Sequence, residues 1–402
     1  MTRRARTALA WCEAGVQTGV RGAGDPPRWE RCVDHPQEEA KEFAEIHFGE
    51  RHRRALVIGG AGFDPRSLNV PTLLSRIMGE RLEGLFVRER RSMGGSSTLR
   101  QRADEHSKQL QARIRASSIA ELQVFAEDGA VTLGRLAATA AAGVDLTKYS
   151  DVVVDASALS MGATFPITRL LFDKIDAGRL RTNLHVMVTA SPSTDGQIRP
   201  IPAQVVSVVH GFAGGLGLEG TAPGSKLWMP QLRSGFEEIL VRVHEWLRPD
   251  GIVPVLPFPA DEPREGDRLI DQFADHFERS VRFARGWEVD ARSLVYADER
   301  NPLDFYRTVL RLHDRRTPVF EATGGSLLVL TPVGSKVLSI GALMAAIERN
   351  LPVVYMEAAG YETSLTKLLA AEYSERDIAH VWLQGEAYPP VRASKAASPQ
   401  QT

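Results

Sequence analysis

Short apolar runs alternate with longer amphipathic stretches along most of this chain. Each apolar run has the length of a buried strand, and each amphipathic stretch has the length of a helix. In the first half, we expect strands at 55–58, 84–87, 122–125, 151–155 and 184–188, and helices at 73–78, 97–116, 133–142 and 165–175. In the second half, we expect strands at 253–256, 294–296, 326–330 and 353–356, and helices at 235–247, 266–283, 302–312 and 337–349. This alternation is typical of parallel sheets covered by helices on both faces.

The pattern predicts an α/β fold made of two consecutive Rossmann-like units with mainly parallel sheets. The glycine-rich stretch 211–224 marks either a boundary or a loop that faces a ligand. We therefore expect an irregular extension at 1–50, a first unit at 51–215, a second unit at 216–388 and a disordered tail at 389–402. Echoes between the halves fit an internal duplication, but they also fit the repetitive βα unit of any α/β chain.

Charge and cysteine content exclude several classes of protein. The 402 residues carry a formal net charge of −1, so no global field attracts nucleic acid or an anionic membrane. The 2 cysteines are too few for a disulfide framework, and no apolar run is long enough for a membrane span. We expect a cytoplasmic protein without a membrane partner. Cys32 and His35 form a single pair with metal-ligand spacing, so no metal site is predicted, and His185 is expected to be an ordinary core histidine.

A glycine-rich turn follows the first buried strand of the pattern. Gly60 and Gly62 permit a tight turn and a close approach of the main chain to a ligand. Asp64 has the chemistry to accept hydrogen bonds from a ribose, and Arg66 has the fork that binds phosphate. The alternative is an ordinary turn in which Asp64 and Arg66 pair with each other.

A second polar turn, which contains Asp155 and Ser157, closes the strand 151–155. Ligands of open α/β sheets bind at the carboxyl ends of strands, so these side chains are candidate ligand contacts. Helix capping by the hydroxyl residues of this turn is the competing interpretation.

The sharpest signal follows the strand 326–330. Thr331, Gly334 and Ser335 form a small polar turn, and Lys336 stands at the start of the next helix. A lysine in the first turn opposes the helix dipole, which makes sense if an anion lies over that turn. The glycine spacing is not that of a P-loop. A solvated lysine beside an ordinary N-cap is the alternative.

Residues 328–357, with Thr-Pro-Val-Gly-Ser-Lys, an apolar helix and a strand ending in Tyr-Met-Glu, resemble the second ligand-binding motif of CRISPR-associated Rossmann-fold (CARF) sensor domains. The resemblance implies a sensor of a nucleotide or cyclic oligonucleotide in prokaryotic antiviral defence. It implies a homodimer or a protein partner in a defence complex. Thr331, Gly334, Ser335 and Lys336 would then line the ligand. Pro332 and Val333 replace the glycines of the family pattern, and no effector segment is evident after Tyr361.

Two other functions fit the same pattern. The glycine turn followed by Glu89 after the next strand also resembles a class I methyltransferase, which would make S-adenosylmethionine the cofactor. A structural subunit of a defence complex is the third possibility. The residue pattern assigns no catalytic group, and it leaves both the ligand and any enzymatic activity open.

Overall fold

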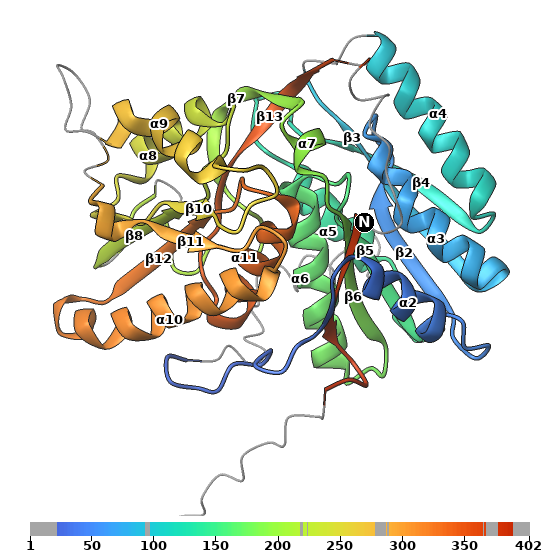
Figure 1. Cartoon of the computed structure of the whole chain (residues 1–402). Coiled ribbons are helices and arrows are strands. Elements are labelled where there is room, and N and C mark those ends of the chain that lie inside the picture. Colours follow the sequence, from blue (N-terminus) through green and yellow to red (C-terminus); the bar gives the residue numbers. More distant parts are fainter. Residues whose placement is uncertain are drawn as a thin grey trace, which may run out of the picture.

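The computed structural model describes residues 22–92, 97–217, 220–222, 224–277, 287, 289–364, 366 and 377–388. The disordered tail expected at 389–402 and part of the glycine-rich stretch 211–224 lie outside these residues. Two α/β units lie side by side (Figure 1). None of the described helices is both long enough and apolar enough to cross a membrane.

The first unit is built on a seven-stranded sheet with the order β1-β14-β6-β5-β2-β3-β4. The pairs from β4 to β6 are parallel, whereas β14 is antiparallel to both β6 and β1. Its strands are β1 (Val33–His35), β2 (Ala55–Gly60), β3 (Leu82–Arg90), β4 (Ser117–Gln123), β5 (Asp151–Asp155), β6 (Asn183–Thr189) and β14 (Ile378–Gln384). Its helices are α2 (Gln37–His47), α3 (Asn69–Met78), α4 (Ser97–Arg113), α5 (Leu133–Ala142) and α6 (Met161–Gly178).

The central strands are buried on both faces, as the continuous apolar runs predict. Along β2, Ala55 and Val57 pack with residues of α2, α3 and α4, while Leu56 and Ile58 pack with residues of α5 and α6. This alternation follows from the two-residue period of a strand. Two helical layers therefore enclose the sheet.

The second unit contains the remaining elements. Its strands are β7 (Ile198–Val208), β8 (Ser225–Pro230), β9 (Gly251–Ile252), β10 (Val255–Pro257), β11 (Val295–Ala297), β12 (Ser326–Thr331) and β13 (Val354–Thr363). Its helices are α8 (Glu237–Leu247), α9 (Glu265–Phe277), α10 (Pro302–Phe320) and α11 (Lys336–Arg349), and the short α7 (Pro192–Asp195) links the units. β8 pairs in parallel with β9 and β12, β10 pairs in parallel with β11, and β7 pairs antiparallel with β13.

Both units share one strand order. Parallel bridges from Gln231 to Val255 and from Leu330 to Val353 extend the second set of strands to β11-β10-β8-β12-β13. The parallel strands of the first unit run β4-β3-β2-β5-β6, so in each unit the first and fourth of these five parallel strands lie next to each other. The prediction of an α/β fold with mainly parallel sheets is confirmed. Common ancestry of the halves stays a prediction, since doubly wound sheets share this order in general.

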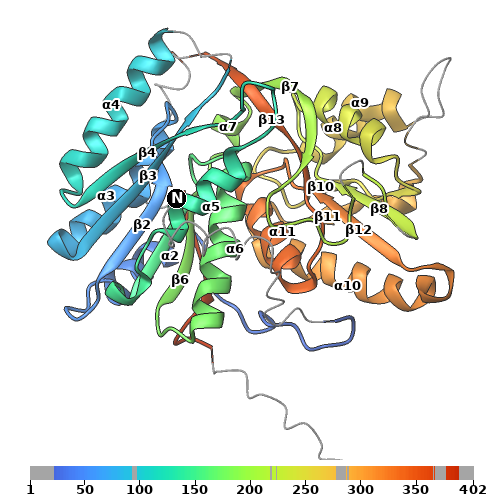
Figure 2. The ribbon, with the colours of Figure 1, turned by 180° about the vertical axis from the view of Figure 1, so that it is seen from behind.

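The predicted boundaries differ from the sheet membership. β1 and α2 belong to the first unit rather than to an irregular extension, and β14 completes the first sheet although it lies within 216–388. β7 lies in the predicted first unit but pairs with β13, and Figure 2 shows these two strands where the units meet. These pairings join distant segments, so local hydrophobic patterns do not encode them.

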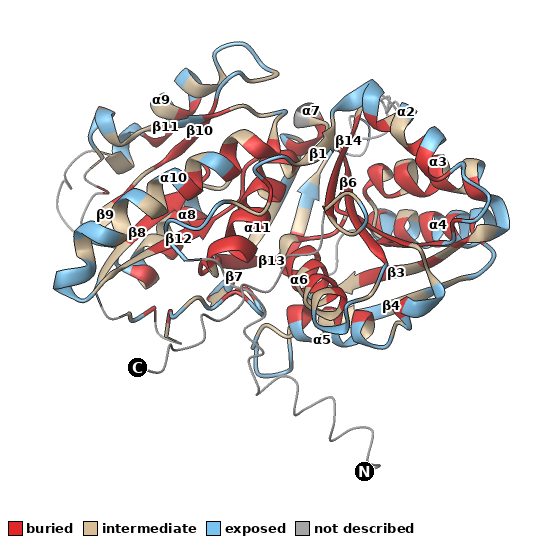
Figure 3. Ribbon diagram, turned by 90° about the horizontal axis from the view of Figure 1, so that it is seen from below, coloured by how far each residue is buried: buried red, intermediate tan, exposed pale blue. Residues whose placement is uncertain are grey.

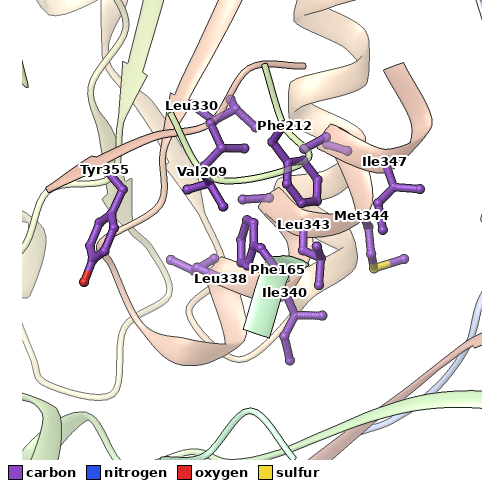
Figure 4. Close-up of a cluster of buried hydrophobic side chains, with 14 of the residues drawn as sticks. Phe165, Val209, Phe212, Leu330, Leu338, Ile340, Leu343, Met344, Ile347 and Tyr355 are labelled. Atoms are coloured by element: carbon purple, nitrogen blue, oxygen red, sulfur yellow. The ribbon is translucent and has the colours of Figure 1, made fainter. Parts of the chain in front are cut away.

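One continuous core spans the junction of the units. α11 contacts both α6 and β6, and Figure 3 shows buried residues on α11 and α6 as well as through both units. Phe165 of α6 lies among Leu338, Ile340 and Leu343 of α11 (Figure 4). The units are therefore joined by packed apolar side chains.

Candidate functional site: a cleft between the two units

A cavity of about 510 Å³ lies where the two units meet, and we call it the cleft. Its walls come from the segments that follow β2, β3, β5, β8 and β12. The carboxyl ends of adjacent first and fourth strands from both units therefore open toward the same space. Ligands of doubly wound sheets bind at this position, and the volume suits a small organic molecule.

Five of the ten residues predicted to contact a ligand line the cleft: Gly62, Asp64, Arg66, Gly334 and Lys336. Arg66 and Lys336 come from different units and face the same cavity. A Cβ at Gly62 would meet nothing within 4 Å, so this glycine leaves space open at the wall.

Arg66 is held by carboxylates within the protein. Its Nη2 lies 2.7 Å from Asp64 Oδ2, and its Nη1 lies 2.8 Å from Asp195 Oδ1. The Asp64 carboxylate also accepts from the Arg66 main-chain N–H at 3.0 Å, which caps the short 3₁₀ turn Pro65–Leu68. The side chain of Arg66 is only 2 % exposed. The geometry is that of the alternative in which Asp64 and Arg66 pair with each other.

The other predicted residues of the first unit, Gly60, Asp155 and Ser157, lie behind the residues that line the cleft. A Cβ at Gly60 would lie 3.0 Å from the main chain of Ala158, so Gly60 allows β2 to approach the turn after β5. Asp155 and Ser157 are fully buried and bond to each other, with Ser157 Oγ 2.5 Å from Asp155 Oδ1. Ser157 Oγ also accepts from the Thr189 main-chain N–H at 2.8 Å. Burial raises the pKa of Asp155 to about 7.

The predicted residues of the second unit also divide between the wall and its support. Thr331 is fully buried and accepts a hydrogen bond from Trp228 Nε1 at 2.9 Å. Ser335 is the N-cap of α11 and accepts from the Leu338 N–H at 3.2 Å. A Cβ at Gly334 would lie 2.7 Å from Gln231 Oε1, which accepts from the Gly334 N–H. These residues shape the turn that presents Lys336.

Lys336 crosses from one unit to the other. Its ammonium donates to the main-chain oxygen of Leu159, which follows β5 in the first unit, at 2.6 Å. Within the described ranges, no carboxylate oxygen lies within 4 Å of its Nζ. Burial lowers the pKa of Lys336, and the nearby Arg66 lowers it further. An ammonium has three donors, so this group retains capacity for another acceptor.

Arg233 is a second cation of the cleft whose positive charge is only partly balanced by nearby carboxylates. It follows β8, lines the cleft and donates to the main-chain oxygens of Asp195 and Gly334. Its ion pair with Asp195 Oδ1 is long, at 3.7 Å, and Asp195 already binds Arg66. Burial lowers the pKa of Arg233. Arg233 and Lys336 thus leave positive charge on the wall supplied by the second unit.

A charged cluster also borders the cleft, and of its members the sequence analysis named Glu89 but missed Arg91 and Glu357. Arg91 binds the carboxylates of Glu89 and Glu357, and its Nη1 donates to the Ala358 oxygen at 2.5 Å. Glu89 Oε1 accepts from the Ser160 main-chain N–H, so this carboxylate stands at the N-terminus of α6. Burial raises the pKa of Glu357 to about 7. The run Arg88-Glu-Arg-Arg directly after the second predicted strand was the available signal.

Aromatic side chains complete the lining. Phe63 packs against Tyr361 with ring centroids 5.7 Å apart, and the Arg91 guanidinium lies 4.9 Å from the Tyr361 ring. Phe236 and Tyr355 also face the cleft. Among the residues that the structure describes, six arginines and one lysine line the cavity against three carboxylates. The cleft therefore combines positive charge with flat apolar surfaces.

Comparisons with known proteins leave this chain without a family. No family model and no curated protein matches it. One similar solved structure is the cytoplasmic domain of a prokaryotic cation chloride cotransporter, with 12 % identity over 78 % of this chain and 99 % of that one, and a TM-score of 0.22. Another is a putative universal stress protein from Pseudomonas aeruginosa UCBPP-PA14, with 9 % identity over 77 % and 95 % of the two chains, and a TM-score of 0.23. At these TM-scores neither likeness bears on the fold or function.

Proposed function

We propose that this protein binds an anionic, nucleotide-like small molecule in the cleft between its two units. The observation that carries the proposal is the convergence of Lys336 and Arg233, two cations with incomplete compensation, beside aromatic walls. A desolvated cation without a carboxylate at hydrogen-bond distance is costly, and a phosphate group would supply an anionic acceptor. The volume exceeds what a lone phosphate needs, and Phe63, Tyr361 and Phe236 offer surfaces on which a base could stack.

The charges in the cleft favour a nucleotide over S-adenosylmethionine. The sulfonium of that cofactor is itself a cation and would meet the excess of arginine and lysine. The acidic ribose partner required by the methyltransferase interpretation would be Glu89. Its two oxygens are engaged by Ser160 N–H and by Arg91, so it has little capacity left for ribose hydroxyls.

A sensing role is the finer part of the proposal. A ligand in the cleft would touch both units, so its occupancy would bias their relative position and could be transmitted to a partner. The resemblance of residues 328–357 to CARF sensor domains supports this role in antiviral defence, with a cyclic oligonucleotide as a candidate ligand. Light scattering and small-angle X-ray scattering, with and without nucleotide, test the oligomeric state and the change in shape.

Calorimetric titration with ATP, cyclic oligonucleotides, NAD(P) and S-adenosylmethionine tests the binding proposal. We expect at least one anionic nucleotide to bind the wild type. Lys336→Met should weaken it about 10- to 100-fold, because a hydrogen bond to a charged group is worth about 1.5–3 kcal/mol.

Lys174→Met is the matched control. Lys174 also donates to main-chain oxygens, those of Ala142 and Val144, but it lies outside the cleft lining. Binding of S-adenosylmethionine alone would transfer support to the enzyme interpretation. Failure of every nucleotide to bind, or equal losses in both variants, would refute the proposal.

A further inference from the structure

A second cluster of polar side chains lies in the first unit, away from the cleft lining. His47 at the end of α2, Asp151 at the start of β5 and His185 in β6 each place one ligand atom within 4.8 Å of the others. His47 Nε2 lies 2.9 Å from Asp151 Oδ1, and His185 Nε2 lies 3.2 Å from the same oxygen. All three residues are buried. Two imidazoles and one carboxylate make a donor set typical of zinc-class metal ions.

Two of the three separations are close to those of bound ligands, and the third, between the two histidines, is within 4.8 Å. Ligand atoms at 2.0–2.1 Å from a tetrahedral zinc ion lie roughly 3.3 Å from one another. His47 Nε2 and His185 Nε2 stand at about this distance from Asp151 Oδ1. The three residues come from three elements that the fold packs together, so the arrangement does not depend on a loop.

Four side-chain nitrogens lie within 3.4 Å of Asp151 Oδ1, which is more than one acceptor oxygen can bond. Besides the two histidines, Asn183 Nδ2 lies at 2.9 Å and Arg53 Nη1 at 3.4 Å. A carboxylate oxygen offers two lone-pair directions. The two imidazole nitrogens can present lone pairs to a cation instead of protons to this oxygen, which relieves the crowding.

Two further histidines, His380 and His35, form an outer layer that orients His185. His185 Nδ1 lies 2.9 Å from His380 Nε2, and His380 Nδ1 lies 3.0 Å from His35 Nδ1. With a metal ion on its Nε2, His185 carries its proton on Nδ1 and donates it to His380, which in turn donates to His35. Metal-bound histidines almost always donate their second N–H to a hydrogen-bond acceptor, which fixes the orientation of the ring. Rings of Phe43, Phe48 and Trp382 pack around these imidazoles.

The charged side chains around Asp151 carry a net negative charge that a metal cation would balance. Arg53 is the guanidinium beside Asp151, and it also pairs with Glu50 at 2.8 Å and with Glu386 at 2.5 Å. With neutral histidines, three carboxylates therefore share one positive charge. A divalent ion brings this group to neutrality.

We infer that His47, Asp151 and His185 bind one divalent transition-metal ion of the zinc class. His380 is the outer-layer residue that positions His185. The ion joins α2, β5 and β6, and through His380 it holds the C-terminal strand β14.

The test uses the full chain, stripped with a chelator and titrated with Co²⁺ and then with Zn²⁺. We expect one Co²⁺ per chain, visible d–d absorption from nitrogen and oxygen ligands, displacement by Zn²⁺, and a higher melting temperature. His47→Gln should weaken binding by at least about 100-fold, and His380→Phe by about 10- to 100-fold, the usual cost of losing an outer-layer partner. His52→Gln is the control, because His52 is 73 % exposed and lies 3.6 Å from Glu50.

Wild-type protein that takes up no Co²⁺, or an ion that binds His47→Gln as tightly as the wild type, overturns the inference. The cluster would then be a hydrogen-bonded network only. If His47→Gln fails to fold, the stoichiometry and spectrum of the wild type, together with the affinity of His380→Phe, decide the question.

Discussion

Glu357 makes the stability of this fold depend on pH in a way that one substitution should remove. Its side chain is 1 % exposed and packs against the first turn of α6, where a Cβ on Gly162 would collide with Oε1. Oε2 binds Arg91 at 3.1 Å, but Arg91 also binds Glu89. Burial raises the pKa of Glu357 from its ordinary value of 4.5 to about 7, the Arg91 charge opposes that rise, and the Glu89 charge adds to it. The folded protein therefore favours the neutral carboxylic acid.

The sign and size of the effect follow from proton linkage. A group whose pKa is higher in the folded state stabilises the fold fully below its ordinary pKa, and this contribution is lost as pH rises through the folded value. Each pKa unit corresponds to 1.36 kcal/mol. Between about pH 4.5 and pH 7, Glu357 should therefore cost the wild type about 3 kcal/mol of unfolding free energy. Glu357→Gln is neutral at every pH and lacks this slope.

Urea denaturation followed by tryptophan fluorescence, at intervals from pH 5 to pH 8, measures the difference. We expect the stability of Glu357→Gln relative to the wild type to rise with pH across this range. Glu362→Gln, an exposed position on the same strand, leaves Glu357 in place and should keep the wild-type slope. Parallel stability curves for the wild type and Glu357→Gln would refute the reasoning.

Three further changes test other parts of the fold. Gly60→Ala should lower the free energy of unfolding, measured by urea denaturation, by about 1–3 kcal/mol, because the new Cβ would press on the main chain of Ala158. Gly62→Ala is the control, because its Cβ would meet open space. Equal losses of stability in the two variants would contradict this. Asp155→Asn should reduce the loss of stability between pH 5 and pH 8, because burial raises the pKa of Asp155 to about 7; an unchanged slope would exclude that carboxyl as a source. Deleting 378–402 removes β14 and should abolish cooperative unfolding of the first sheet, while deleting 389–402 should not; a normal melting curve for the longer deletion would show that β14 is dispensable.

The fold was predictable wherever a local pattern encodes it. Strands such as Ala55–Gly60, Asp151–Asp155 and Ser326–Thr331 contain apolar runs that end at small or polar residues, and each appears close to its expected place. β4 was less accurately predicted, at 122–125 rather than Ser117–Gln123, because this edge strand alternates exposed and half-buried residues. A half-solvated edge lacks the apolar run of a central strand.

The candidate site was predictable only in part, for the same reason. Turns after strands identify the rim of a sheet, which is how Arg66 and Lys336 were expected near a ligand. The interaction partners of the cleft arginines were not predictable from the sequence. Asp195 is 129 residues from Arg66, and Glu357 is 266 residues from Arg91. The histidine cluster likewise unites α2, β5 and β6. Contacts between such distant residues depend on how the elements pack, and no spacing in the chain reveals them.

The placement of β14 also bears on how the protein matures during translation. The first sheet needs a strand from residues 378–384, which leave the ribosome only after the entire second unit has been made. Until then the nascent first unit presents the unpaired edge of β6, a surface that invites pairing with other chains. Synthesis of β14 then covers this edge of β6.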